Sequence, residues 1–505
     1  MSLQVFNSLS KRVETFEPLT PNVVRMYVCG PNLYGPAHVG HALSYTFFDV
    51  VRRYLEYRGY EVRHVQNFTD IEDRILDRAQ REGRSIFEIA SEYLDRFLTE
   101  MDALNIQRAH AYPRATEVIP KMIEIIEGLI ARGHAYVVDG DVYYRVTSFK
   151  RYGALSGRSI EQMQAGARVD VDERKEHPMD FALWKATKPG EPSWPSPWGP
   201  GRPGWHIECS AMSMQYLGEQ LDIHGGGDDL RFPHHENEIA QSEGFTGKPF
   251  VRYWIHNALM KPPVGEEMHR HLGNFVSIQE ALAKYEADAI RLFILSAHYR
   301  TPLRWTDEGV SAAARGVERL RTALANADAA LGRAGIPSQG PLEEAAAGAV
   351  RAFERAMDND FGTPQAIAAL FDLAVEINRA ASAALQGHRG AAGGLAEAAD
   401  TLRRLAGVLG LRIAQVQVPQ ETAAEVLRAL EAMRAREPAL FPDGGATNAH
   451  DAVAALLAGR DRARQAKRFD IADAIRRQLG ELGIIVEDLP GGSRWRVAVR
   501  NDPRS

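Results

Sequence analysis

The first third of the chain alternates β-prone runs with a helical pattern, and this constrains its fold more than any other feature. A β-prone run at 23–28 leads into Cys29-Gly30-Pro31, and a helical pattern from about 42 to 57 follows a turn-rich loop. A second β-prone run at 61–66 leads into Asn67-Phe68-Thr69-Asp70. Strand–loop–helix–strand order predicts a parallel sheet covered by helices, with ligands at the carboxyl ends of the strands.

The length of 505 residues is too great for one hydrophobic core and predicts several domains. Residues 135–205 are rich in Gly, Pro and Trp, which indicates an inserted module and an irregular segment. From about 308 to 435 the chain is dominated by Ala, Leu, Glu and Arg, and this composition favours helices. Breaks near 335–341 and 442–446 separate the helical units, and an amphipathic helix is expected at about 470–482.

The charge balance and the cysteine count exclude several classes of protein. With 60 Lys and Arg against 66 Asp and Glu, the chain is not a strongly basic nucleic-acid binder, so any RNA contact would come from local basic patches. Cys29 and Cys209 are too few and too far apart for a disulfide framework. Since no apolar run is long enough to cross a bilayer, we expect a cytoplasmic protein without a membrane partner.

The run His38-Val39-Gly40-His41 lies at the expected start of the first helix. Two imidazoles three positions apart at a helix N-terminus can meet phosphate oxygens, which the helix dipole and the free N–H groups also attract. The glycine between them lets a nucleotide approach the backbone closely. An ordinary pair of histidines at a helix start explains the same residues, so the run alone leaves both interpretations open.

A second candidate site is the run His234-His235-Glu236-Asn237-Glu238. On a helix, His234 and Glu238 share one face and can hold one ion. Histidine and carboxylate are zinc ligands, and the two thiols of the chain would complete four-coordination. A solvated acidic helix with two surface histidines is the alternative. The spacing is not H-E-x-x-H, which disfavours a metalloprotease.

The run His224-Gly225-Gly226-Gly227-Asp228-Asp229 follows an apolar segment. Three glycines permit the backbone to approach a flat base or a sugar, and a nearby carboxylate can accept hydrogen bonds from ribose hydroxyls. The G-x-G-x-x-G spacing is missing, so the run does not indicate a nicotinamide dinucleotide site. A plain turn remains the competing explanation.

Taken together, these runs resemble the cysteinyl-tRNA synthetase family of class I aminoacyl-tRNA synthetases. Residues 29–41 are similar to the HIGH region of the class. Residues 67–73, 201–210 and 224–238 resemble the cysteine-specific family, and so does the C-terminal segment 464–495. The resemblance covers nearly the whole chain, with all the runs in the order of the family.

The resemblance implies one Zn²⁺ ion per chain, bound by Cys29, Cys209, His234 and Glu238. It implies a cysteine pocket that contains Gly30, Thr69, Trp205 and His224. ATP would be bound by His38, His41, Asp229 and Arg270, and His38, His41 and Arg270 would be the catalytic residues. The anticodon contacts would be made by Arg464, Phe469, Asp473 and Asp488.

The reaction that the resemblance implies is the ATP-dependent ligation of L-cysteine to tRNA(Cys) through a cysteinyl-adenylate. Mg²⁺ is expected beside ATP, and the enzyme is expected to be a monomer. Zinc holds a thiolate far better than a hydroxyl, because soft sulfur suits the ion and binding favours deprotonation. Serine differs from cysteine by one atom, which packing alone separates poorly, so the metal would supply the discrimination.

The implied fold class is α/β, with a Rossmann-like parallel-sheet catalytic domain, an inserted connective module, an α-helical bundle and a small anticodon-binding domain. The expected boundaries are 1–134 and 206–255 for the catalytic domain, 135–205 for the connective module and active-site segment, 256–307 for the ATP-loop and stem-contact region, 308–415 for the bundle, and 416–505 for the anticodon-binding domain.

One run departs from the family pattern. Class I synthetases carry a K-M-S-K-S loop, and this chain has Glu267-Met268-His269-Arg270-His271. Arg270 keeps the positive charge of the second lysine, whereas Glu267 would repel pyrophosphate unless it points away. We favour a functional variant of the loop over a slowed paralogue and over altered loop positions. Two alternative functions compete with the ligation of cysteine to tRNA.

The first alternative is a paralogue that activates cysteine and joins it to a small amine. The helical C-terminal part argues against it, because a small acceptor needs no anticodon-binding domain. The second alternative is a non-catalytic paralogue that binds zinc and RNA. The retained pair of His38 and His41 argues against it, whereas Glu267 argues for it.

Overall fold

The computed structural model describes residues 2–166, 173–263, 265, 275–332, 335–413, 420–441, 446, 449–489 and 492–497. The chain forms two compact units, Met1–Leu411 and Arg412–Ser505. None of the helices described is both long enough and apolar enough to span a membrane.

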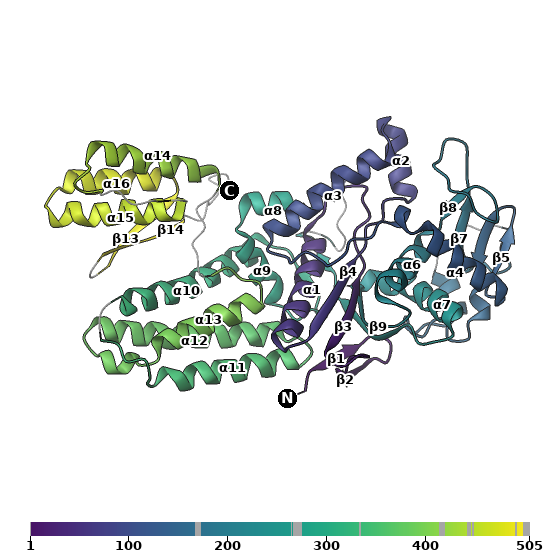
Figure 1. Ribbon diagram of the computed structural model, residues 1–505, viewed down its shortest axis with the longest axis horizontal. Helices are drawn as coiled ribbons and strands as arrows, with labels where there is room; N and C mark the ends of the chain where they lie inside the picture. The colour runs from purple at the N-terminus through teal and green to yellow at the C-terminus, as the bar shows by residue number, and fades with distance from the viewer. Residues whose placement is uncertain are drawn as a thin grey trace. The chain divides into compact units, whose positions relative to one another are not determined.

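A four-stranded parallel sheet lies at the centre of the first unit (Figure 1). Its strand order is β10-β9-β3-β4, and all three pairings are parallel, which confirms the predicted sheet type. Met26 lies opposite His64 on one side and Ile223 on the other. The strands are β3 (Val23–Val28), β4 (Glu61–Gln66), β9 (Leu221–Gly227) and β10 (Val251–Asn257).

Helix α1 (Val39–Tyr57) connects β3 to β4 and buries a continuous apolar face against the sheet. It begins three residues before the predicted start at 42, because His38 caps it and fixes the first turn. The chain leaves the helix at Gly59, whose φ of +88° suits glycine. The helices that follow β4 are α2 (Asp73–Glu82), α3 (Ile86–Ala103) and α4 (Ile119–Ala131).

The Gly-, Pro- and Trp-rich segment forms a separate antiparallel sheet with the order β5-β6-β7-β8. Its buried Trp184 fills the core of this module, and Gly201 lets β8 approach that ring, since a Cβ there would lie 2.3 Å from Trp184 Nε1. The strands are β5 (Ala135–Val138), β6 (Asp141–Tyr144), β7 (Phe181–Ala186) and β8 (Gly201–Pro203). A short hairpin, β1 (Gln4–Asn7) and β2 (Arg12–Thr15), precedes the main sheet.

Two helices return the chain from this module to the main sheet. They are α6 (Trp205–Leu217), before β9, and α7 (His234–Thr246), between β9 and β10, and they pack on each other. Their facing sides are almost entirely buried although they carry several polar residues. Buried polar groups need partners, so this pair of helices is a candidate location for a functional site. After β10 the chain forms β11 (Met260–Lys261), α8 (Ile278–Lys284), α9 (Ala287–Leu295) and β12 (Leu303–Arg304).

The Ala- and Leu-rich region is helical, as its composition predicts. Four helices run side by side in Figure 1 and pack on one another: α10 (Asp307–Leu331), α11 (Leu342–Asp358), α12 (Thr363–Leu385) and α13 (Leu395–Val408). Arg291 of α9 connects the helix α1, which covers the sheet, to the end of the helical bundle. Its buried guanidinium forms an ion pair with Asp49 at 2.6 Å and donates to the Leu409 carbonyl.

The second unit contains three helices and a hairpin among its described residues. They are α14 (Gln420–Arg436), α15 (Ala449–Gln465), α16 (Phe469–Glu481), β13 (Ile484–Leu489) and β14 (Gly492–Val497). Val426, Leu456 and Leu479 are among the residues of its own buried apolar core. Because the core is independent, the unit has the makings of a separate domain.

Candidate functional site

A cavity of about 1030 Å³ opens at the carboxyl ends of β3, β4 and β9. This is where ligands bind in open parallel sheets. Nine of the residues singled out from the sequence line it: Cys29, Gly30, His38, His41, Thr69, Trp205, Cys209, Asp229 and His234.

Four buried donor groups meet at the inner wall of the cavity. Cys29 follows β3, Cys209 lies on α6, and His234 and Glu238 lie one turn apart on α7. The two sulfur atoms are 3.7 Å apart, Glu238 Oε1 is 3.8 Å from Cys29 Sγ, and His234 Nε2 is 3.2 Å from Glu238 Oε1. One ligand atom from each residue lies within 4.8 Å of all the others.

The chemistry of this donor set fits a zinc ion. Both cysteines are free thiols, and sulfur, imidazole and carboxylate are all zinc ligands, so the four groups suit tetrahedral coordination. Burial raises the pKa of Cys29 and of Glu238 and lowers the pKa of His234. A divalent cation would stabilise the thiolate and carboxylate forms that burial alone disfavours. Magnesium and calcium prefer oxygen ligands, so the two sulfurs argue against them.

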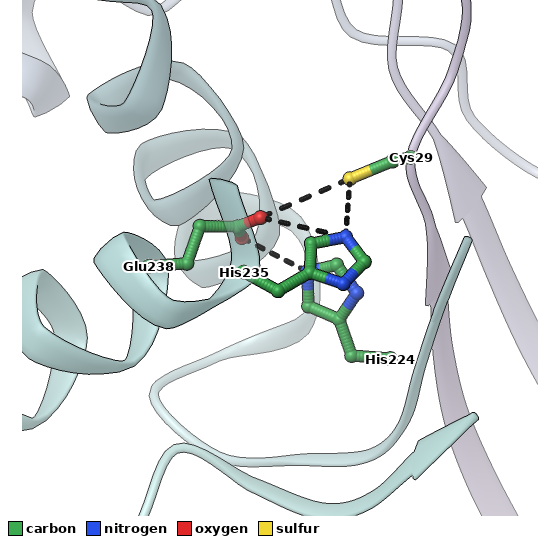
Figure 2. A group of neighbouring side chains, drawn as sticks. All are labelled: Cys29, His224, His235 and Glu238. Atoms are coloured by element: carbon green, nitrogen blue, oxygen red, sulfur yellow. Dashed lines mark hydrogen bonds and ion pairs between the residues drawn. The ribbon is translucent and has the colours of Figure 1, made fainter. Parts of the chain in front are cut away.

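A second, overlapping donor set consists of Cys29, His224, His235 and Glu238 (Figure 2). His235 Nε2 lies 3.3 Å from Cys29 Sγ, and His224 Nε2 lies 2.9 Å from Glu238 Oε2. Behind His235, its Nδ1 atom is 2.8 Å from His256 Nε2. In the sequence, His235 is marked as a ligand only by the doubled histidine at 234–235, and no motif marks His256.

Of the four residues expected to bind cysteine, three line the cavity and one lies behind its wall. Gly30, Thr69 and Trp205 line the cavity, whereas His224 is not among the lining residues and lies behind Glu238. Gly30 is required by close packing, because a Cβ there would lie 1.6 Å from the Asn67 carbonyl oxygen. Trp205 begins α6, and its ring centroid is 4.4 Å from that of His234.

His38 and His41 form a capping box at the start of α1. His38 Nδ1 accepts from the Gly40 N–H at 3.0 Å, and His41 Nδ1 accepts from the His38 N–H at 3.2 Å. Each neutral ring therefore carries its hydrogen on Nε2, where it can donate to a ligand. Burial, and next the charge of His38, lowers the pKa of His41, which keeps that ring neutral.

The segment after the K-M-S-K-S-like run lies against this capping box. His38 forms a bridge with Ser277, and the Val39 N–H donates to the Val276 carbonyl at 3.0 Å. The Phe275 ring lines the cavity, with its centroid 5.4 Å from that of His38. Arg270 and the whole run 267–271 lie outside the described residues.

The expected anticodon residues belong to the second unit. Arg464 lies in the last turn of α15, Phe469 is the first residue of α16, and Asp473 lies one turn further along α16. The Phe469 ring is 58% exposed, which is unusual for a large aromatic side chain. Asp488 lies in β13, and its side chain is outside the described part.

Three family models match the chain in sequence. They are tRNA synthetases class I (C) catalytic domain at residues 15–315, DALR domain at 352–414, and Cysteinyl-tRNA ligase anticodon binding domain at 447–496. The cysteine–tRNA ligase of Dehalococcoides mccartyi is 48% identical over 497 residues, which cover 98% of this chain and 100% of that protein. The chain belongs to the cysteine–tRNA ligase family. The family member of Symbiobacterium thermophilum is 47% identical and covers 99% of this chain and 100% of its own length.

A solved structure shows that the fold is that of class I synthetases. Mycobacterium tuberculosis methionyl-tRNA synthetase in complex with methionyl-adenylate superposes with a TM-score of 0.59 at 14% sequence identity. The match covers 81% of this chain and 94% of that chain. The predicted α/β class is therefore confirmed for this cysteine–tRNA ligase family member.

Proposed function

We propose that the enzyme ligates L-cysteine to tRNA(Cys) through a cysteinyl-adenylate formed from ATP, and that a zinc ion recognises the thiol. The observation that carries the proposal is the buried Cys29–Cys209–His234–Glu238 cluster, which opens into the same cavity as the His38–His41 pair. The family match along the whole chain supports the same reaction.

Cysteine would bind with its side chain toward the cluster. A bound zinc ion would supply a soft partner that prefers a thiolate to a hydroxyl, which separates cysteine from serine. The side chains of Thr69 and Trp205 and the backbone at Gly30 would hold the rest of the amino acid, since all three line the cavity beside Cys29 and Cys209.

Adenylate formation would be catalysed by position and charge. The carboxylate of cysteine attacks the α-phosphate of ATP, and pyrophosphate leaves. The Nε2–H groups of His38 and His41 are placed at the N-terminus of α1, where they and the helix dipole would stabilise the developing phosphate charge. Arg270 would clamp the leaving phosphates, with Mg²⁺ beside them, and Asp229 would accept from the ribose. No side-chain nucleophile is required.

The second step would transfer the cysteinyl group to the terminal ribose hydroxyl of tRNA(Cys). The second unit would read the anticodon, with the exposed Phe469 ring stacking on a base and with Arg464, Asp473 and Asp488 binding base edges. We infer that the enzyme acts as a monomer, as the family resemblance leads us to expect.

Charging assays with labelled cysteine test the proposal. The full-length, zinc-loaded chain should charge tRNA(Cys) with cysteine and not with serine. Cysteine-dependent pyrophosphate exchange without tRNA charging, but with transfer to a small amine, would instead support a paralogue. Bound zinc with neither reaction would support a non-catalytic zinc- and RNA-binding protein.

A further inference from the structure

Glu208 carries a completely buried carboxylate directly behind the cavity. Its Oε2 atom accepts from the Thr69 hydroxyl at 2.9 Å, and its Oε1 atom has no hydrogen-bond partner among the described residues. No described Lys, Arg or His forms an ion pair with it. The nearby Asp70 differs, because both of its oxygens accept from Thr116. A buried carboxylate without a cation is costly and therefore calls for an explanation.

Thr69 connects Glu208 to the cavity. Its backbone groups are already used: the N–H donates to the Pro31 carbonyl at 3.4 Å, and the carbonyl accepts from the Leu33 N–H at 3.1 Å. Its hydroxyl is therefore the one polar group left to meet a ligand. Because that hydroxyl donates its hydrogen to Glu208, it can only accept from a ligand in the cavity. Such a group favours a ligand that carries N–H donors.

We propose that Glu208 is a positioning residue for the α-ammonium group of the amino-acid substrate. It acts through the Thr69 hydroxyl, which it orients as an acceptor. The proposal rests on the proposed function and adds a second recognition element to it.

The connectivity of cysteine fits this arrangement. In cysteine two carbon atoms separate the sulfur from the nitrogen, so a sulfur held at the Cys29–Cys209 pair keeps the ammonium nearby. Glu208 is the sequence neighbour of Cys209, and Thr69 lines the same cavity. The positive charge that the described protein residues do not supply would then come from the substrate, where a low-dielectric surrounding strengthens the attraction.

Two truncated thiols separate this role from a structural one. Cysteamine keeps the thiol and the ammonium, whereas 3-mercaptopropionate keeps the thiol and has no amine. Titration calorimetry on the zinc-loaded full chain should show that Glu208→Gln weakens cysteamine binding about tenfold or more. Thr69→Val should have a similar effect, and Thr69→Ser should restore binding. The affinity for 3-mercaptopropionate should not fall in any of these variants.

Glu100→Gln is the matched control. Glu100 on α3 is also a buried glutamate with one partnered and one unpartnered oxygen, and it does not line the cavity. Glu100→Gln should leave the affinities for cysteamine and 3-mercaptopropionate unchanged. Metal analysis of each variant should show that the zinc content is retained.

The inference would be overturned if Glu208→Gln lowered the affinities for cysteamine and 3-mercaptopropionate equally, or lowered neither. The double variant gives a second test. If the losses of cysteamine affinity caused by Glu208→Gln and Thr69→Val multiply fully when combined, the inference is also overturned, because two groups acting on one ammonium should couple. Since the readout is binding, a chain that never charges tRNA would refute the proposed function while this comparison still decides the role of Glu208.

Discussion

His224 Nε2 lies 2.9 Å from Glu238 Oε2, and both side chains are completely buried. The other carboxylate oxygen, Oε1, is turned toward Cys29 Sγ at 3.8 Å (Figure 2). The same oxygen also lies 3.2 Å from His234 Nε2. His224 therefore holds Glu238 in the orientation in which one oxygen faces the donor cluster. Partners of this kind fix a ligand and tune its basicity, although they do not touch the metal.

Replacing His224 should therefore weaken zinc binding. We expect His224→Phe, which keeps an aromatic ring and loses the hydrogen bond, to lower the affinity for zinc about 10- to 100-fold. Competition with a chromophoric chelator measures this directly. The exposed His388 serves as a control, since His388→Phe should leave the affinity unchanged. An unchanged affinity in His224→Phe would contradict the supporting role of this histidine.

The two functions of His38, as a helix cap and as a phosphate donor, can be separated. Asparagine is a good N-cap and can accept from the Gly40 N–H, but it is too short to present a donor where Nε2 lies. His38→Asn should keep the melting temperature and the zinc content, and should lower the rate of cysteine-dependent pyrophosphate exchange about 100-fold or more. Retained exchange in a stable variant would show that His38 is only a cap.

The exposed ring of Phe469 should contribute to tRNA binding alone. Stacking of one base on an aromatic side chain is worth about 1–3 kcal/mol, so Phe469→Ala should raise the KM for tRNA(Cys) about 5- to 100-fold. Pyrophosphate exchange, which needs no tRNA, should not change. Phe87 on α3 is 54% exposed, and Phe87→Ala provides the control with an unchanged KM. Equal effects of the two substitutions would argue against base stacking at Phe469.

His64 should lower the free energy of unfolding of the first unit at acidic pH. Burial lowers the pKa of His64 to about 3, and the charges of Arg52 and His110 contribute further. Between about pH 6.5 and pH 3 the unfolded chain binds a proton on this ring that the folded chain does not, so stability falls as the pH falls through that window. At pH 5 the loss from this one residue is about 2 kcal/mol.

Urea unfolding at pH 7.5 and pH 5, followed by tryptophan fluorescence, tests this prediction. His64→Leu should lose about 2 kcal/mol less than the wild-type chain between the two pH values. Leucine is suitable because neither ring nitrogen of His64 has a hydrogen-bond partner among the described residues. The exposed His388→Leu should reproduce the wild-type difference. A wild-type-like difference in His64→Leu would show that the ring is not held neutral by the fold.

The sequence predicted the elements whose patterns are local. The strands at 23–28 and 61–66 were found with their observed bounds, because β-prone runs flanked by turn residues form buried parallel strands. The α1 start was placed three residues late, because the cap depends on His38 accepting from the backbone and not on apolar periodicity. The antiparallel sheet β5–β8 was not resolved into strands. Only β5 and β6 form a local hairpin, whereas β6 pairs with β7 about 40 residues later.

The site likewise combines residues that a sequence motif marks with residues that meet only in the folded chain. Cys29, Cys209, His234 and Glu238 were assigned through the family resemblance, and the fold brings them together. The partners of these residues could not be predicted, because they meet only when α6 and α7 pack against the ends of the sheet. His256 reaches the cluster through His235, and Glu208 reaches the cavity through Thr69. Neither contact leaves a spacing in the sequence that a motif could record.

Zinc K-edge X-ray absorption of the full-length enzyme, with and without L-cysteine, tests the central claim most directly. Without substrate, the ion should show two sulfur neighbours at about 2.3 Å and two lighter ligands. With L-cysteine the number of sulfur neighbours should rise to three, and L-serine should leave it at two. A sulfur number that stays at two with cysteine would contradict recognition of the substrate thiol by the metal.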